Sequence, residues 1–140
     1  MRRIVLDTNV IVSGLRSRGS ASHELLRRVD GGQYSLVLSV PLAIEYEAVL
    51  KREAPGLGIE APQVDAVVDY LCSVAEHRRI WFLWRPLLPD PKDDMLLELA
   101  VEAGCSAIIT FNTRHFGLIR RFGVEACTPR EFLERLRRTP

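Results

Sequence analysis

Acidic residues occur at three separate places in the sequence where they could do chemistry together. Asp7 directly follows Ile4-Val5-Leu6, a short apolar run that predicts a buried strand. Glu45 lies in a predicted helix after a second strand, and the doublet Asp93 and Asp94 lies in the first turn of a later helix. Carboxylates that are brought together repel one another, and a divalent cation removes this repulsion. The pattern predicts a site for Mg²⁺ or Mn²⁺, which prefer oxygen ligands.

A metal at such a site can polarise a phosphodiester, activate a water molecule and neutralise the leaving oxyanion. Ligands of open parallel α/β sheets bind beyond the carboxyl ends of the strands, so polar residues that follow strands are expected on the same rim. They could orient the carboxylates and bound water, or contact the substrate. The residues in this group are Thr8, Asn9, Ser39, Thr110, Asn112 and His115.

Each acid also has a purely structural interpretation. An Asp after a strand is common in turns, and the segment 90–93 (Asp-Pro-Lys-Asp) is a good capping box for a helix. Glu45 and Asp94 could be solvated surface charges. No single residue decides between the two interpretations. The expected convergence of several acids on one rim favours the functional one.

Strands and helices alternate along the chain, which favours an α/β fold with right-handed crossovers. One helix is predicted to begin after Ser39 and to break at 55–58, and another is predicted from about 91 to 103 with Asp90 as its cap. We expect a single domain over residues 1–140, in three layers, with a central and mainly parallel sheet of four to five strands. The strands are predicted at 4–6, 34–38, 80–84, 107–110 and 124–127.

Composition narrows the class of protein. A chain of 140 residues with 47% hydrophobic and 26% charged residues suits one globular domain. Its apolar runs are too short for a membrane span or a signal peptide, so we expect a cytoplasmic protein without membrane contact. Three dispersed cysteines argue against a disulfide framework or a zinc site. The net charge of +1 does not by itself indicate a nucleic-acid binder.

Several segments resemble PIN domains, in the order and spacing of that family and over nearly the whole chain. Residues 5–10 (VLDTNV) resemble the opening strand motif, and residues 39–50 (SVPLAIEYEAVL) the segment with the second acid. Residues 90–100 (DPKDDMLLELA) and 108–116 (IITFNTRHF) resemble the helix with the third acid and the strand after it. The chain is most similar to bacterial and archaeal PIN proteins described as toxins of toxin–antitoxin pairs (VapC-like).

The resemblance implies a Rossmann-like PIN topology and a metal-dependent endoribonuclease that acts on RNA. It implies that Asp7 and Glu45 are metal ligands, with the third acid at Asp93 or Asp94. Many PIN domains carry a further acid where this chain has Asn112, so one metal is expected to be held more firmly than a second. Related toxins also dimerise and are silenced by a cognate antitoxin, which implies a homodimer and a protein partner here.

Other functions fit part of the same pattern. A catalytically inactive PIN-type module would bind RNA or a protein without cutting, and metal–carboxylate chemistry alone does not separate RNA from DNA. A phosphohydrolase with Asp7 as nucleophile would need a second acid close by, and residues 8–11 contain none. Loop arginines could contact phosphates or be solvated charges. These are Arg16, Arg18, Arg85 and Arg114.

Overall fold

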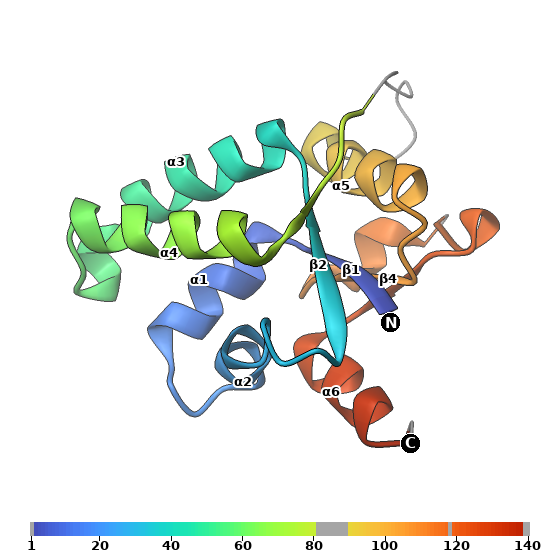
Figure 1. The fold of residues 1–140 in the computed structure, drawn as a ribbon, viewed down its shortest axis with the longest axis horizontal. Coiled ribbons are helices and arrows are strands. Elements are labelled where there is room, and N and C mark those ends of the chain that lie inside the picture. Colours follow the sequence, from blue (N-terminus) through green and yellow to red (C-terminus); the bar gives the residue numbers. More distant parts are fainter. Residues whose placement is uncertain (1, 81–89, 118, 139–140) are drawn as a thin grey trace.

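The computed structural model describes residues 2–80, 90–117 and 119–138, which form one parallel sheet with helices packed around it (Figure 1). Its strand order is β3-β2-β1-β4-β5, and every neighbouring pair is parallel. This confirms the predicted α/β fold with a central parallel sheet. The strands are β1 (Arg2–Leu6), β2 (Tyr34–Leu38), β3 (Glu76–His77), β4 (Ala107–Ile109) and β5 (Glu125–Cys127).

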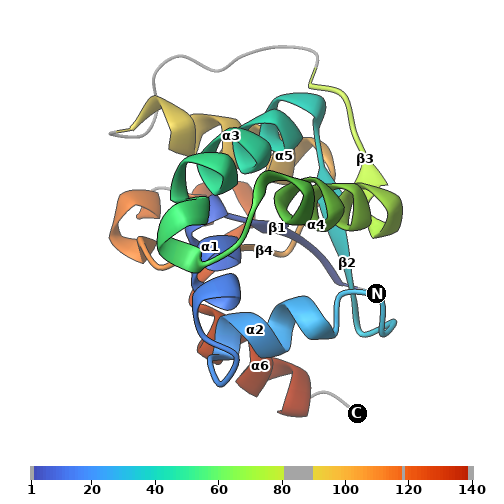
Figure 2. The same cartoon turned by 90° about the vertical axis from the view of Figure 1, so that its left-hand side faces the viewer.

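The helices cover both faces of the sheet, which confirms the predicted three layers (Figures 1 and 2). One face carries α1 to α4, in which α1 packs against α2 and α3, and α3 against α4. On the other face α5 packs against β1, β2 and β4. The last helix, α6, packs against α2. The helices are α1 (Thr8–Arg16), α2 (Ala21–Arg27), α3 (Val40–Leu57), α4 (Ala61–Val74), α5 (Pro91–Glu102) and α6 (Pro129–Arg138), with short 3₁₀ turns η1 (Thr113–Phe116) and η2 (Ile119–Phe122).

The strand order creates a switch point between β1 and β4. The chain moves outward from β1 through β2 to β3, then crosses to β4 and continues to β5 on the other side. Connections therefore leave the adjacent strands β1 and β4 in opposite directions, and this opens a crevice at their carboxyl ends. Asp7 follows β1 and Thr110 follows β4, so these two residues stand at the crevice.

The two strands beside the switch point are anchored in the core. Ile4, Val5 and Leu6 of β1 and Ile108 and Ile109 of β4 have no exposed surface. A parallel sheet covered on both faces needs such continuous apolar runs rather than an alternating pattern. Each of these side chains contributes about 1.5–3 kcal/mol through its burial. The rim that follows them therefore rests on a rigid support.

Helix starts that help to position the rim agree with the sequence-based expectations. The Ser39 hydroxyl accepts a hydrogen bond from the Leu42 amide at 3.3 Å and caps α3. The Asp90 carboxylate accepts from the Lys92 amide at 3.0 Å and caps α5. Both caps satisfy amides that would otherwise lack a helical partner. No described helix is long and apolar enough to cross a membrane.

The predicted end of this helix at 55–58 is confirmed, although α3 continues through Pro55 to Leu57 before it stops. Proline removes one helical hydrogen bond to the carbonyl of Lys51, but both residues are exposed and water can serve that carbonyl. The helix ends at Gly58, whose φ of 71° is left-handed. The amide of Ile59 donates to the Ala54 carbonyl and that of Gly58 to the Pro55 carbonyl, which closes the helix end.

The strand that pairs with β2 comes earlier in the chain than the predicted strand 80–84. Of the predicted strand 80–84, Ile80 has no regular structure, and 81–84 lie outside the described residues. The strand that pairs with β2 is instead β3, with Glu76 opposite Val37 and His77 opposite Leu38. A polar pair can form this strand because it lies at the edge of the sheet and is partly exposed. Hydrophobicity alone could not indicate it.

Candidate active site

Asp7 and Thr110 are joined directly across the switch point. The amide of Asp7 donates to the Ile109 carbonyl at 2.9 Å, which continues the β1–β4 pairing one residue beyond the strands. The Thr110 hydroxyl donates to Asp7 Oδ2 at 2.7 Å. The same hydroxyl oxygen accepts from the Asn112 amide at 3.0 Å. The buried threonine therefore orients the Asp7 carboxylate at the carboxyl edge of the sheet.

The electrostatic surroundings of Asp7 disfavour its charged form. Burial raises the pKa of Asp7 above its ordinary value, although the Thr110 hydroxyl and the amides of Asn9 and Thr8 act in the opposite direction. The negative charge of Asp90 adds to the increase. A positive charge that enters the crevice would therefore stabilise the ionised form of Asp7.

Glu45 is connected to the same rim through Thr8. The Thr8 hydroxyl donates to Glu45 Oε2 at 2.8 Å, which ties the second turn of α3 to the start of α1. The next residue, Tyr46, is fully buried and donates its hydroxyl to the Leu6 carbonyl at 2.5 Å. Burial raises the pKa of Tyr46 well above its usual value, and the charges of Asp7 and Glu45 raise it further. The charges of Asp7 and Glu45 therefore both reach the phenol of Tyr46, which places the two acids near each other.

The acidic doublet lies in the first turn of α5, and both of its side chains are buried. Asp93 is 5% exposed and Asp94 is 7% exposed. Burial raises the pKa of Asp93 to about 6, and the charges of Asp7 and Asp90 contribute to the increase. A ring nitrogen of His115, Nδ1, lies 3.2 Å from Asp93 Oδ2 and acts in the opposite direction. Asp93 is therefore within the electrostatic reach of Asp7.

The donor set suits the divalent ion expected from the sequence. Asp7 and Asp93 carry hard oxygen ligands, and their mutual repulsion is the kind that a cation relieves. Beside them, Asn9 Oδ1 is a buried acceptor without a donor among the described residues. Over the same residues, no group of three or more His, Cys, Asp or Glu side chains is arranged to hold a metal. The arrangement thus fits an ion that takes one or two carboxylates and completes its shell with water.

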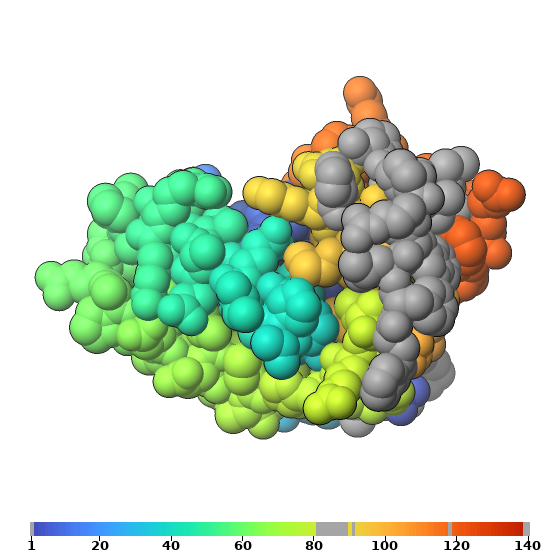
Figure 3. Space-filling model, turned by 90° about the horizontal axis from the view of Figure 1, so that it is seen from above, coloured from blue at the N-terminus to red at the C-terminus, as the bar shows by residue number. Residues whose placement is uncertain are grey.

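The structure brings most of the predicted site residues to one edge of the sheet. Seen from above, α3 and α5 stand on either side of this edge, with N-terminal atoms between them (Figure 3). Ser39 is set apart, because it is buried and its hydroxyl oxygen serves the cap of α3. Asn112 and His115 are exposed at the edge. The residues linked by hydrogen bonds or by electrostatic interactions are Asp7, Thr8, Glu45, Asp93, Thr110 and His115.

Sequence reasoning missed two contributors to this edge and a further buried acid on α5. Asp90 was expected only as a helix cap, yet its charge also raises the pKa of Asp7 and of Asp93. Tyr46 was not singled out in the sequence, and its hydroxyl holds the end of β1 against α3. Glu98 on α5 is a further buried acid, one helical turn after Asp94. An acid at this i,i+4 spacing from the doublet was the signal that could have found it.

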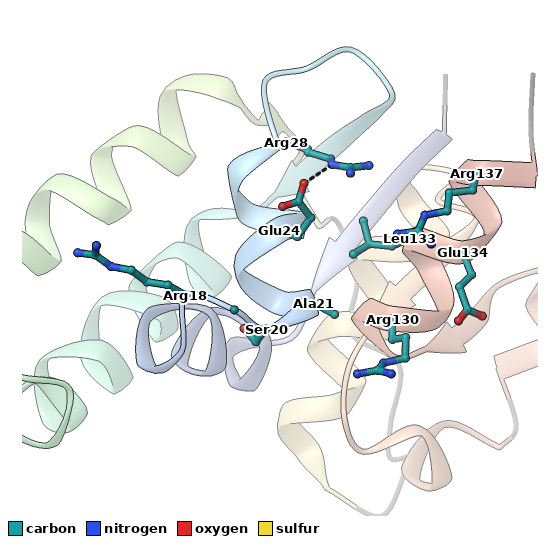
Figure 4. A pocket seen from close by; sticks show the side chains of 10 residues that line it. Arg18, Ser20, Ala21, Glu24, Arg28, Arg130, Leu133, Glu134 and Arg137 are labelled. Carbon is teal, nitrogen blue, oxygen red and sulfur yellow. Dashed lines mark hydrogen bonds and ion pairs between the residues drawn. The ribbon is translucent and has the colours of Figure 1, made fainter.

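One cleft borders the acidic edge, and another cleft elsewhere on the described surface is also charged. One, of about 580 Å³, lies between α1 and α3 and borders the edge through Asn9 and Phe111. The other, of about 460 Å³, lies between α2 and α6 and is rich in arginine (Figure 4). Arg16 lines the first cleft, whereas Arg18 lines the second. Arg114 is exposed in η1, and the predicted phosphate contact Arg85 lies outside the described residues.

Comparisons with known proteins agree with this architecture. A chain in the crystal structure of VapBC2 from Rickettsia felis, bound to a DNA fragment from their promoter, superposes with a TM-score of 0.60 at 13% sequence identity. The match covers 89% of this protein and 98% of that chain, and at this identity it shows a shared fold. Comparison with curated proteins finds no match. The sequence profile of the PIN domain family matches residues 3–114. The chain therefore belongs to the PIN domain family.

Proposed function

We propose that this protein is a divalent-metal-dependent endoribonuclease in which Asp7 and Asp93 hold Mg²⁺ or Mn²⁺ and Glu45 acts on the water shell of the ion. The observation that carries the proposal is the pair Asp7 and Asp93, which come from distant parts of the chain and repel each other within one crevice. Clustered acids with raised pKa values are typical of functional sites. Membership of the PIN family supports the same activity. Asp93 is preferred to Asp94 as the third acid because Asp7 and His115 both act on it.

Different residues at the crevice would have different roles in the reaction. A bound cation supplies charge neutralisation at the phosphate and lowers the pKa of a coordinated water. Thr110 and Thr8 orient the carboxylates of Asp7 and Glu45 through the hydrogen bonds described above. His115 holds Asp93 and stands exposed at the border of the site. Asn112 lies close by as an exposed neutral donor for substrate.

We further propose that the protein is the toxin of a toxin–antitoxin pair and that it forms a homodimer. Support comes from the shared fold with a chain of the VapBC2 complex. A cognate antitoxin would then be the protein partner, and RNA the substrate. Co-expression with any small reading frame found beside the gene, and co-purification of the two products, would test the partner separately from the chemistry.

The nuclease activity is tested by cleavage of labelled RNA with Mg²⁺, Mn²⁺ or a chelator. We expect the wild-type protein to cut RNA with either ion and not with the chelator. Asp7→Asn should be slower by about 100-fold or more, since the variant removes a ligand charge that acts on the chemical step. Asp69→Asn, which changes an exposed acid on α4, is the matched control and should retain wild-type activity.

The competing function is a PIN-type module that binds RNA or protein without cutting it. The absence, among the described residues, of three side chains arranged to hold a metal is the observation that favours it. RNA binding without cleavage under any divalent ion would establish this alternative. Undiminished cleavage by folded Asp7→Asn, in a preparation free of other nucleases, would refute the assignment of the site.

A further inference from the structure

The cleft between α1 and α3 begins where the acidic edge ends. Asn9 borders it on one side and directly follows Thr8, the residue that binds Glu45. Phe111 borders it on the other side and directly follows Thr110, the residue that binds Asp7. The cleft, of about 580 Å³, therefore borders the edge through the direct neighbours of the two threonines that bind the acids.

Phe111 exposes a large aromatic side chain at the mouth of the cleft. It is 47% exposed, although a phenylalanine gains free energy from burial. Its backbone is held in place because the Thr110 hydroxyl donates to Asp7 and accepts from the Asn112 amide, so the bonds span the residue. An exposed ring on a fixed support loses little conformational entropy when a flat ligand stacks on it. Nucleic-acid bases are such ligands.

The charges of the cleft suit a phosphate backbone. Arg16 on α1 and Arg52 on α3 line it from its two walls. Arg16 has no ion-pair partner within the part of the chain that the structure describes, and Arg52 reaches Glu53 only at 3.8 Å. Glu53 also lines the cleft, so two guanidinium groups face one carboxylate. Guanidinium groups present paired donors that match phosphate oxygens.

We propose that this cleft is a subsite for single-stranded RNA, in which a base beside the scissile phosphate stacks on Phe111. Arg16 and Arg52 contact the phosphates of the adjoining nucleotides. A paired base already stacks within its helix and cannot lie on the ring, so duplex RNA is a poor substrate. The inference rests on the proposed function and assigns the residues of this chain that bind the nucleotides beside the cleavage site.

Binding and cleavage are measured separately. Binding uses a fluorescein-labelled ten-nucleotide single strand and its duplex, by anisotropy in the Asp7→Asn background. Phe111→Ala and Phe111→Leu should both weaken single-strand binding about tenfold, while Phe111→Trp retains it, because stacking needs an aromatic face. Phe122→Ala is the matched control, since Phe122 is 38% exposed but lies outside the cleft lining. Cleavage by the same variants in the wild-type background should follow binding.

The arginines are tested by the salt dependence of binding. Arg16→Gln combined with Arg52→Gln should lower affinity and reduce the slope of log affinity against log salt by about one to two, as two phosphate contacts are lost. Arg137→Gln, in the cleft between α2 and α6, should leave both unchanged.

The outcomes separate the two proposals. Failure of the wild type to cleave, with Phe111-dependent binding intact, would remove the nuclease and keep the subsite. Metal-dependent cleavage that Asp7→Asn abolishes but Phe111→Ala and Phe111→Leu leave unchanged would keep the nuclease and overturn the subsite. Equal affinity for the duplex, or RNA affinity insensitive to all cleft variants, as expected if a protein segment occupies the cleft, would also overturn it.

Discussion

The carboxyl edge of the sheet and the cleft between α2 and α6 both gather charge, but they balance it differently. At the edge, Asp7 is half-buried and Asp93 is buried, and the pKa of Asp93 is raised to about 6. In the cleft, Glu24 is bonded to Arg28 and also to Arg27, and these partners lower its pKa to about 2 (Figure 4). One region keeps like charges together, and the other pairs opposite ones.

This difference in charge pairing shows which charges are compatible with folding and which oppose it. A surface ion pair such as that of Glu24 is compatible with folding and contributes little. Buried carboxylates that repel one another oppose folding unless something outside the chain compensates them. The edge therefore has the energetics of a binding site, and the cleft has those of ordinary surface. Removing a charge should have opposite effects on stability in the two regions.

The largest expected effect comes from Asp93→Asn. RNA cleavage should fall by about 100-fold or more, while the free energy of unfolding at pH 7.5 should rise by about 1–3 kcal/mol. The folded protein holds a proton on Asp93 between its ordinary pKa of 3.8 and about 6, so wild-type stability decreases as pH rises through that window. The gain of the variant should be largest above pH 6 and should vanish near pH 4.

Denaturant unfolding at the two pH values, without divalent ions, measures this effect. Addition of Mn²⁺ should then stabilise the wild type more than the variant, because the bound ion offsets the repulsion between the carboxylates of Asp7 and Asp93. A variant that is less stable than the wild type at pH 7.5 would show that Asp93 is a structural acid, and the contrast between the regions would fail.

A smaller effect is expected from Thr110→Val, which keeps the shape of the side chain and removes its hydroxyl. Loss of the hydrogen bond to Asp7 should raise the pKa of Asp7 further and slow cleavage about tenfold. The pH–rate profile should move to higher pH, since Asp7 must be ionised to act as a ligand. Thr110→Ser retains the hydroxyl and should behave as wild type. An unshifted profile for the valine variant would disprove the positioning role.

The smallest effect is expected from Glu24→Gln. Cleavage should stay within about twofold of wild type, and the melting temperature should fall by no more than about 2 °C, because the ion pairs are exposed to solvent. The pKa of Glu24 is lowered, so its contribution is present above pH 4.5 and is lost as pH falls toward 2. Thermal melts from pH 7 to pH 2 check this. A large loss of activity would mean that the cleft between α2 and α6 takes part in catalysis.

Local patterns in the sequence predicted the elements whose boundaries are set by nearby residues. Ser39 and Asp90 cap their helices as expected, because a cap involves amides two or three residues away. The end of α3 at 55–58 was predicted from equally local signals and is confirmed, since Gly58 closes the helix. The strand Glu76–His77 was not predicted, because its pairing with β2 at the edge of the sheet, and not its hydrophobicity, decides its place.

By itself, the sequence determined the parallel α/β architecture and the rim on which Asp7 and Thr110 lie, because alternating elements and right-handed crossovers leave few topologies. Only the tertiary structure decided which acids interact electrostatically. Asp93 and Asp94 are adjacent in sequence, and the packing of α5 against the sheet is what brings Asp93 to Asp7 and His115. Electrostatic coupling depends on distance and burial in three dimensions, and neither is encoded in the spacing of residues along the chain.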